Sequence, residues 1–231
     1  AIASKEALNL SLGITLSAEQ IAALTHDIVW MEEREVQGHK VLVPVLYLAQ
    51  AEGRLAPSGA LIQGRDVALI SGGDLSNQGT LRASDNLSVT AANIGNSGLM
   101  QANQRLQLLA TDSIRNAQGG IIAGNDVSLF AVNDISNERS VTTHESSSGD
   151  RYQHRRDFID SAARIEAGTD LQVSAGNDIR NIGGAISAGG DASLQAGNDL
   201  ILASAETVDE QKRRDRKGHT YRTDITQYGS D

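Results

Sequence analysis

The side chains best suited to bind a ligand in this sequence are basic, and they gather in two short polar segments. The first contains Arg151, His154, Arg155 and Arg156, and the second contains Lys212, Arg213, Arg214, Arg216 and Lys217. The whole chain has a formal net charge of −9, so both clusters are positive patches on an acidic molecule. Clustered positive charge attracts anions in a salt-sensitive way. We predict contact with anionic partners such as lipopolysaccharide or heparin-like glycans, and the alternative of two solvated loops stays open.

Carboxylates that could act as catalytic acids recur at one position of the sequence, at Asp66, Asp126, Asp170 and Asp191. An enzyme acting on polysaccharides would also need aromatic side chains to stack on sugars, and aromatics make up only 3% of this chain. Aspartates in turns accept backbone hydrogen bonds. We therefore interpret this series as structural and predict no catalytic residue.

Metal and cofactor sites are also not indicated. The segments Gly72-Gly73-Asp74 and Gly189-Gly190-Asp191 resemble the calcium-binding nonapeptide repeat, but the tandem nine-residue spacing is missing. The five histidines show no paired ligand spacing. We predict neither metal nor cofactor.

Composition narrows the remaining classes of protein. A sequence pI near 5.0 makes nucleic acid an unexpected partner, because phosphates would repel the chain. There is no cysteine, which excludes disulfides and zinc fingers. The chain begins at Ala1 and shows neither a signal peptide nor an apolar run long enough to span a bilayer. We interpret it as a piece of a longer protein whose export signal lies upstream.

The elements that must position these side chains come from an internal repeat of 19 to 21 residues, with one step of 44 between Val127 and Leu171. Apolar residues recur in four columns. The first is Leu61, Leu81, Met100, Ile121, Ile165 and Ile186; the second is Val67, Leu87, Leu106, Val127, Leu171 and Ala192; the third is Leu69, Val89, Leu108, Leu129, Val173 and Leu194; the fourth is Leu75, Ile94, Ile114, Ile135, Ile179 and Leu200. A polar column of Asn77, Asn96, Asn116, Asn137 and Asn181 follows the fourth, and we predict a ladder of side-chain amides rather than a ligand site.

Short strands joined by Gly-, Asn- and Asp-rich turns cannot bury a core alone, but stacked about 4.8 Å apart in a coil they can. A leucine-rich repeat has a similar period but needs several leucines and a helical return segment. The sequence therefore predicts an all-β, right-handed parallel β-helix. Val41, Tyr47 and Leu55 match the first, second and fourth columns and extend it to seven coils.

Interruptions of the repeat divide the chain into segments. We predict a cap or joint over 1–40, coils over 41–137, a polar hairpin excursion over 138–163, coils over 164–203 and a second charged excursion over 204–231, after which a further coil should follow. For the first excursion a disordered loop is the alternative. Within the cap we expect a strand near Leu8–Leu16, a short helix from Ser17 to Thr25, and the start of a hairpin that runs from Ile28 to Leu48 and leads into the coil.

The recurring AGND or AGTD units and the trailing D-I-x-N, over roughly residues 17 to 231, resemble the filamentous haemagglutinin family of two-partner secretion exoproteins. The stretch LSAEQIAALTHDIVWMEEREVQGHKVLVPVLYL, from Leu16 to Leu48, is similar to the start of the second haemagglutinin repeat region of contact-dependent growth inhibition toxins.

The resemblance implies a fibrous, secreted segment on the cell surface of a Gram-negative bacterium, and not an enzyme. Its implied partners are an outer-membrane two-partner secretion transporter, the upstream and downstream domains of the same exoprotein, and the target-cell outer membrane or a surface receptor or glycan. The implied function is to present or deliver a C-terminal toxin to a neighbouring cell. The alternative is an adhesin shaft that binds a host receptor or polysaccharide.

Overall fold

The computed structural model describes residues 28–36, 39–48, 61–148, 151–215 and 218–231. These residues form β-strands and no α-helix. The all-β prediction is therefore confirmed, and the strands stack into a parallel coil of about seven turns that fits a right-handed β-helix. The helix predicted from Ser17 to Thr25 and the strand predicted near Leu8–Leu16 lie outside the described residues, as does Leu55.

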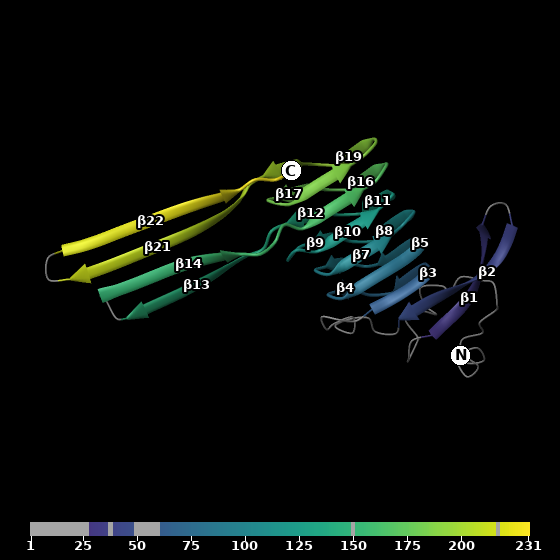
Figure 1. Ribbon diagram of the computed structural model, residues 1–231, viewed down its shortest axis with the longest axis horizontal. Coiled ribbons are helices and arrows are strands. Elements are labelled where there is room, and N and C mark those ends of the chain that lie inside the picture. The colour runs from purple at the N-terminus through teal and green to yellow at the C-terminus, as the bar shows by residue number, and fades with distance from the viewer. Residues whose placement is uncertain (1–27, 37–38, 49–60, 149–150, 216–217) are drawn as a thin grey trace.

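The coil, which we call the rod, presents three strand-bearing faces (Figure 1). Its strands are β3 (Leu61–Ser71), β4 (Leu75–Asn77), β5 (Thr80–Ala91), β6 (Ile94–Asn96), β7 (Leu99–Ala102), β8 (Arg105–Ala110), β9 (Ile114–Asn116), β10 (Ile121–Gly124), β11 (Asp126–Ala131), β12 (Ile135–Glu138), β15 (Arg164–Ala167), β16 (Leu171–Ala175), β17 (Ile179–Ile182), β18 (Ala185–Ala188), β19 (Ala192–Ala196) and β20 (Leu200–Ala203). The long β3 and β5 bend from one face onto the next, and the short strands of the third face stack in the order β20-β17-β12-β9-β6-β4.

The core consists of apolar ladders that run along the rod. The second, third and fourth columns pair in the predicted register from coil to coil. Leu106, Leu108 and Ile114, which come from one coil, are all essentially inaccessible to solvent. Removal of such side chains from water is the main force that stabilises the rod, because no disulfide or α-helix contributes among the described residues.

Two members of the first predicted column are wrong by one residue. Ile62, not Leu61, pairs with Leu81, and Ile122, not Ile121, pairs with Met100 and Ile165. Leu61 is 60% exposed, whereas Ile122 is buried. In both segments two apolar residues are adjacent, and alternation across a strand turns only one of them inward.

The N-terminal hairpin is present, with β1 (Ile28–Val36) antiparallel to β2 (His39–Leu48), at the end of the rod opposite the C-terminus (Figure 1). The register predicted for β2 is wrong: Tyr47 lies opposite Ile70 rather than Val67, and Val41 pairs with Arg34 of β1. Only the last residues of β2, Leu46 to Leu48, join the rod, and Leu46 and Tyr47 pair with β1 on their other side.

Glycines at the corners of the rod allow successive coils to approach closely. A β-carbon at Gly176 would overlap the carbonyl oxygen of Val132 in the coil below, whereas one at Gly73 would meet nothing within 4 Å. We predict that Gly176→Ala destabilises the chain by about 2 kcal/mol through overpacking. Gly73→Ala should change stability by less than about 0.5 kcal/mol. Urea denaturation midpoints compare the two, and equal midpoints would contradict this view of the corners.

Candidate interaction surface

Two hairpins leave the rod near its C-terminal end and join into one four-stranded antiparallel sheet, which we call the arm (Figure 1). The first hairpin is β13 (Val141–Ser148) with β14 (Tyr152–Ile159), and the second is β21 (Ala205–Asp215) with β22 (Gly218–Tyr228). The hairpin-like excursions predicted from the sequence are thus confirmed. Their union, through antiparallel pairing of β14 with β21, was not predicted.

The spacing of the rod explains why the hairpins meet. The first follows β12 and the second follows β20, and these two strands are separated by β17 on the third face. They are therefore two strand spacings apart, or about 9.6 Å. A hairpin is itself two strands wide. Hairpins that leave the rod at every second coil therefore lie side by side, with their neighbouring strands close enough to form hydrogen bonds. At the intervening coil the chain turns tightly through Gly183, which has a φ of +60°.

Asp157 joins three strands of the arm. One oxygen of its carboxylate accepts a hydrogen bond from the hydroxyl of Thr143 on β13 (2.7 Å), and the other accepts one from the backbone N–H of Val208 on β21 (3.0 Å). The side chain is only 5% exposed. Hydrogen bonds from Thr143 and Val208 lower the pKa of Asp157 below its usual value, since they favour the ionised form.

We predict that the joint between the hairpins weakens in acid. The pKa of Asp157 is lower in the folded chain than in the unfolded chain. The carboxylate therefore stabilises the fold above about pH 4, and this stabilisation is lost as the pH falls through the pKa of the folded chain. The difference in thermal midpoint between the parent and Asp157→Asn should be clear near neutrality and should vanish in strong acid. A difference that does not depend on pH would contradict this role of the carboxylate.

A second polar contact across the joint involves Asp209 of β21. Its carboxylate lies 2.9 Å from Nε2 of His154 and 3.7 Å from Nε of Arg156, both on β14. Two of the predicted ligand-binding residues are therefore engaged in joining the hairpins. Arg155 also approaches a carboxylate, that of Asp157, at 3.6 Å.

Arg139 fastens the base of the arm to the rod. Its Nε donates to the carbonyl of Gly183 (2.7 Å), and its guanidinium lies over the ring of Tyr228 at 5.3 Å. The first residues of one hairpin are thus linked to the last residues of the other. A side chain at Gly183 would meet both Ala205 and Arg139, so this corner has to remain glycine.

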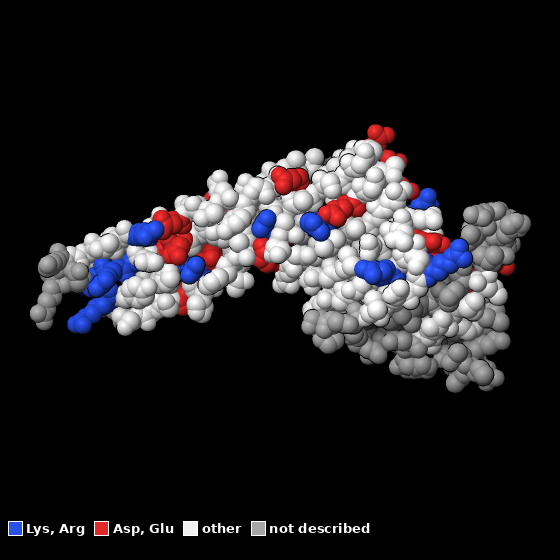
Figure 2. Space-filling view, in the orientation of Figure 1, with Lys and Arg blue, Asp and Glu red and all other residues white. Residues whose placement is uncertain are grey.

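Four further predicted cations, Arg151, Lys212, Arg213 and Arg214, lie toward the free end of the arm. Figure 2 shows Lys and Arg side chains gathered next to the terminal turns, with Asp and Glu closer to the rod. Within the described residues, no ion pair involves Arg151, Lys212, Arg213 or Arg214. Arg216 and Lys217 lie outside the described residues.

A shallow hollow of about 200 Å³ at this end brings predicted and unpredicted residues together. We call it the tip patch, and it is lined by Gln153, Lys212, Arg213, Arg214, His219 and Tyr221. The rings of His219 and Tyr221 stack with an interplanar angle of 10°. Gln153 and Tyr221 both lie opposite Lys212, on the strands to either side of it.

The tip patch contains the side chains used to recognise acidic sugars. Guanidinium and ammonium groups bind carboxylate, sulfate or phosphate, and exposed rings cover the apolar face of a sugar. Gln153, His219 and Tyr221 were not predicted as site residues. Their positions depend on the register of β14, β21 and β22, and that register follows from the union of the hairpins.

The asparagine column forms a hydrogen-bonded ladder inside the rod. From Nδ2 to Oδ1, Asn77 donates to Asn96 (2.8 Å), Asn96 to Asn116 (2.8 Å), Asn116 to Asn137 (2.8 Å) and Asn137 to Asn181 (2.9 Å). All five side chains are buried. The ladder lies on the third face, directly before the corner from which the hairpins emerge, and it holds that corner in place.

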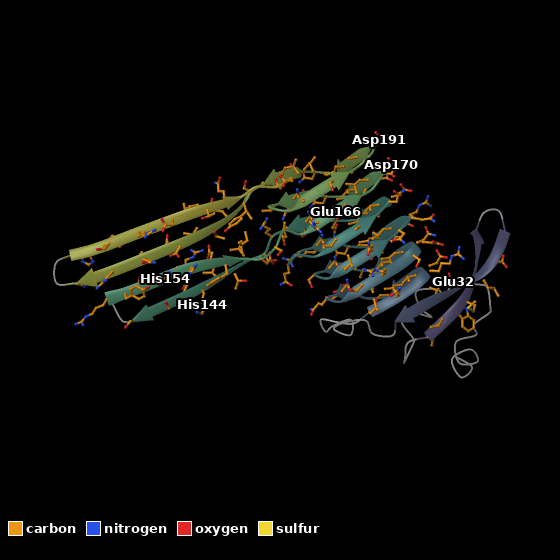
Figure 3. All side chains as sticks on the ribbon, in the orientation of Figure 1. Glu32, His144, His154, Glu166, Asp170 and Asp191 are labelled. Carbon is orange, nitrogen blue, oxygen red and sulfur yellow. The ribbon has the colours of Figure 1, made fainter. Side chains whose placement is uncertain are left out.

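The aspartate series of the rod has structural contacts. Asp66 accepts a hydrogen bond from Asn86, and Asp170 accepts one from the backbone N–H of Asp191. Figure 3 places Asp170 and Asp191 on the side of the rod away from the arm. A shallow hollow of about 590 Å³ nearby is lined by Arg105, Gln107, Asp126, Val127, Ser128, Asp170, Leu171, Gln172, Asp191, Ala192 and Ser193.

Two other kinds of site are absent from the described residues. These residues contain no group of three or more His, Asp or Glu side chains that could hold a metal ion. No helix suited to crossing a membrane is found in this part of the chain.

Comparison with known proteins agrees with the fold. The family model described as "Hemagglutinin repeat" matches residues 143–226, which span the arm and the two coils between its hairpins. The chain is 39% identical over 222 residues to the deoxyribonuclease CdiA of Dickeya dadantii, a match that covers 93% of this chain. The chain is a CdiA-like filamentous haemagglutinin repeat region. No solved structure matches it.

Other CdiA proteins match this repeat region over nearly its whole length. The 16S rRNA endonuclease CdiA of Enterobacter cloacae is 34% identical over 98% of the chain, and the tRNA nuclease CdiA of Escherichia coli strain STEC_O31 is 32% identical over 96%. The matches cover only 7% of each of these relatives. The nuclease activities in their names belong to those proteins, whereas the segment matched here is a haemagglutinin repeat and has a structural role.

Proposed function

We propose that this repeat region is a rigid segment of a secreted contact-dependent growth inhibition exoprotein, and that its arm contacts the anionic outer surface of a neighbouring Gram-negative cell. The observation that carries the proposal is the tip patch. In it, two hairpins from different coils combine stacked rings with cations that form no ion pair with the described residues. In this proposal, the rod provides length and rigidity, and the arm binds the surface of the neighbouring cell.

The wider setting of the proposal follows from the relatives. The exoprotein would pass through an outer-membrane two-partner secretion transporter and reside at the cell surface. Upstream and downstream domains would flank this segment, and a C-terminal toxin would be presented or delivered to the target cell. The names of the relatives, each a toxin or nuclease CdiA, support this assignment.

Charge distribution along the arm supports an anionic partner. The net charge of the chain is −9, yet the free end of the arm presents Lys212, Arg213 and Arg214 to solvent. Acidic groups of the arm, such as Asp157 and Asp209, lie closer to the rod and are engaged between strands. An approaching anionic surface would therefore meet the positive end first.

Removal of the first hairpin tests the proposal. Residues 140–160 are replaced by Gly-Gly, which imitates the tight turn at Gly183 and Gly184 on the neighbouring coil. We expect the parent chain to bind outer-membrane vesicles that contain lipopolysaccharide and to lose this binding as salt is added. The shortened chain keeps the cations of the second hairpin but loses Gln153 and the cations of the first, so it should bind more weakly than the parent and depend less steeply on salt. Equal binding by the two chains, both folded by circular dichroism, would contradict the proposal.

A further inference from the structure

The outer edge of β22 is not paired with any described strand of the chain. The sheet order places β22 at one margin, with β21 on one side and no described strand on the other. Every side chain from His219 to Gln227 is exposed. Natural edge strands are often blocked by proline, by a bulge or by charged side chains, especially lysine. The sequence from His219 to Gln227 contains neither proline nor lysine, and its pairing with β21 shows no register shift.

The sequence of β22 is complementary to itself when two copies run antiparallel with Thr223 at the centre. Arg222 then lies opposite Asp224 of the second copy, and Tyr221 lies opposite its Ile225. The next pairs are Thr220 with Thr226 and His219 with Gln227. Opposite charges, an aromatic with a β-branched residue, and two threonines are all favourable cross-strand pairs.

The side chains of each pair also lie on the same face of the sheet. Residues two apart on a strand share a face, so Arg222 and Asp224 point to one side, where they already form an ion pair of 2.7 Å. Tyr221 and Ile225 point to the other side and are 68% and 59% exposed. A two-fold axis perpendicular to the sheet, midway between the two copies of Thr223, leaves each side chain on the same face of the combined sheet. It would join the two ion pairs into a ring of four alternating charges and cover two exposed apolar pairs.

Neighbouring registers are disfavoured by charge. A shift of two residues in one direction places Arg222 opposite Arg222 of the second copy, and a shift in the other direction places Asp224 opposite Asp224. Like charges directly opposite each other destabilise a sheet. The other margin of the arm, β13, has no such symmetry: its sequence is VTTHESSS and contains a single acidic residue, Glu145. The symmetric complementarity is therefore a property of β22.

We propose that two copies of this chain associate through β22, forming a continuous eight-stranded antiparallel sheet from two arms. The partner is a second copy because the complementarity is symmetric about Thr223. Edge pairing covers little surface, so the association is weak and depends on concentration. The proposal goes beyond the function proposed above, and it concerns an edge of the arm that does not require an anionic partner.

Charge reversal gives a test with an internal rescue. Arg222→Asp places carboxylates opposite carboxylates, and Asp224→Arg places guanidiniums opposite guanidiniums. Each variant alone should dimerise at least about tenfold more weakly than the parent in sedimentation equilibrium. An equimolar mixture of the two should form a heterodimer, because the carboxylates of one copy would then face the guanidiniums of the other. If the parent is monomeric throughout a concentration series, or if the mixture associates no better than its components, the proposal fails.

Cysteine cross-linking checks the axis independently, since the chain has no cysteine of its own. Thr223→Cys places two thiols directly opposite each other, within the Cα separation of about 4.4 to 6.8 Å that a disulfide requires. Mild oxidation should give a covalent dimer. Ser147→Cys, at a position on β13 that is also exposed, should remain monomeric under the same conditions. Cross-linking at equal rates, or none at residue 223, would overturn the proposed axis.

Discussion

Replacement of Asn116 by aspartate is expected to destabilise the rod by about 3–5 kcal/mol at neutral pH. The Asn116 side chain has no exposed surface. Its Nδ2 donates to Oδ1 of Asn137 and to the carbonyls of Gly120 and Arg164. An aspartate could still accept the hydrogen bond from Asn96. It would, however, face these three acceptors with another acceptor and would bury a charge that has no opposite charge in the ladder.

The loss should depend on pH in a defined direction. Burial raises the pKa of the new carboxyl above its value in the unfolded chain, so the loss of stability relative to the parent is smallest in acid and grows as the pH rises above about 4. Urea denaturation at several pH values measures this. Asn103→Asp, at an exposed turn, should stay within about 0.5 kcal/mol of the parent. If both variants lose the same stability, the ladder does not hold the rod together.

Loss of the charges at the free end of the arm should reduce binding to anionic membranes by at least about tenfold. Lys212, Arg213 and Arg214 are exposed, and three such charges at roughly 0.5 kcal/mol each amount to about one order of magnitude in the binding constant. Their joint replacement by glutamine should therefore weaken binding to vesicles that contain lipopolysaccharide and flatten its dependence on salt.

A charge-matched variant distinguishes an effect of the charges on the arm from an effect of the net charge of the chain. Arg65, Arg82 and Arg105 are exposed on the rod, and their replacement by glutamine removes the same charge elsewhere. This variant should keep most of the affinity and most of the salt dependence. If it loses as much binding as the arm variant, the arm has no special part in the contact and only net charge matters.

The coils of the rod could be predicted from the sequence because each one repeats the same local pattern. Val67 and Leu69, two residues apart and followed by a turn, recur in every coil, and stacking in register follows from the repeat. The prediction of which residue faces the core was wrong at single positions where the local pattern was ambiguous. Ile121 and Ile122 are both apolar, and only the pairing with Met100 shows that Ile122 points inward.

The position of Tyr47 could not be predicted for a different reason. Its place in the periodic pattern suggested a coil position opposite Val67, but β2 pairs first with β1 and joins the rod only over Leu46–Leu48. The tip patch was missed for a related reason. Gln153 and Lys212 are far apart in the sequence and lie opposite each other only because two coils separate the hairpins. A residue spacing of 44 marked the insertion, but it did not reveal that the two insertions pair.

The union of the two hairpins into one arm is tested most directly by a disulfide between them. Gln153 and Lys212 lie opposite each other on β14 and β21. In Gln153→Cys/Lys212→Cys we expect an intramolecular disulfide on mild oxidation at low protein concentration. Ser147→Cys/Lys212→Cys spans two strand spacings, about 9.6 Å, and should not close. Closure of the first pair alone is the predicted result; failure of the first pair, or equal closure of both, would contradict it.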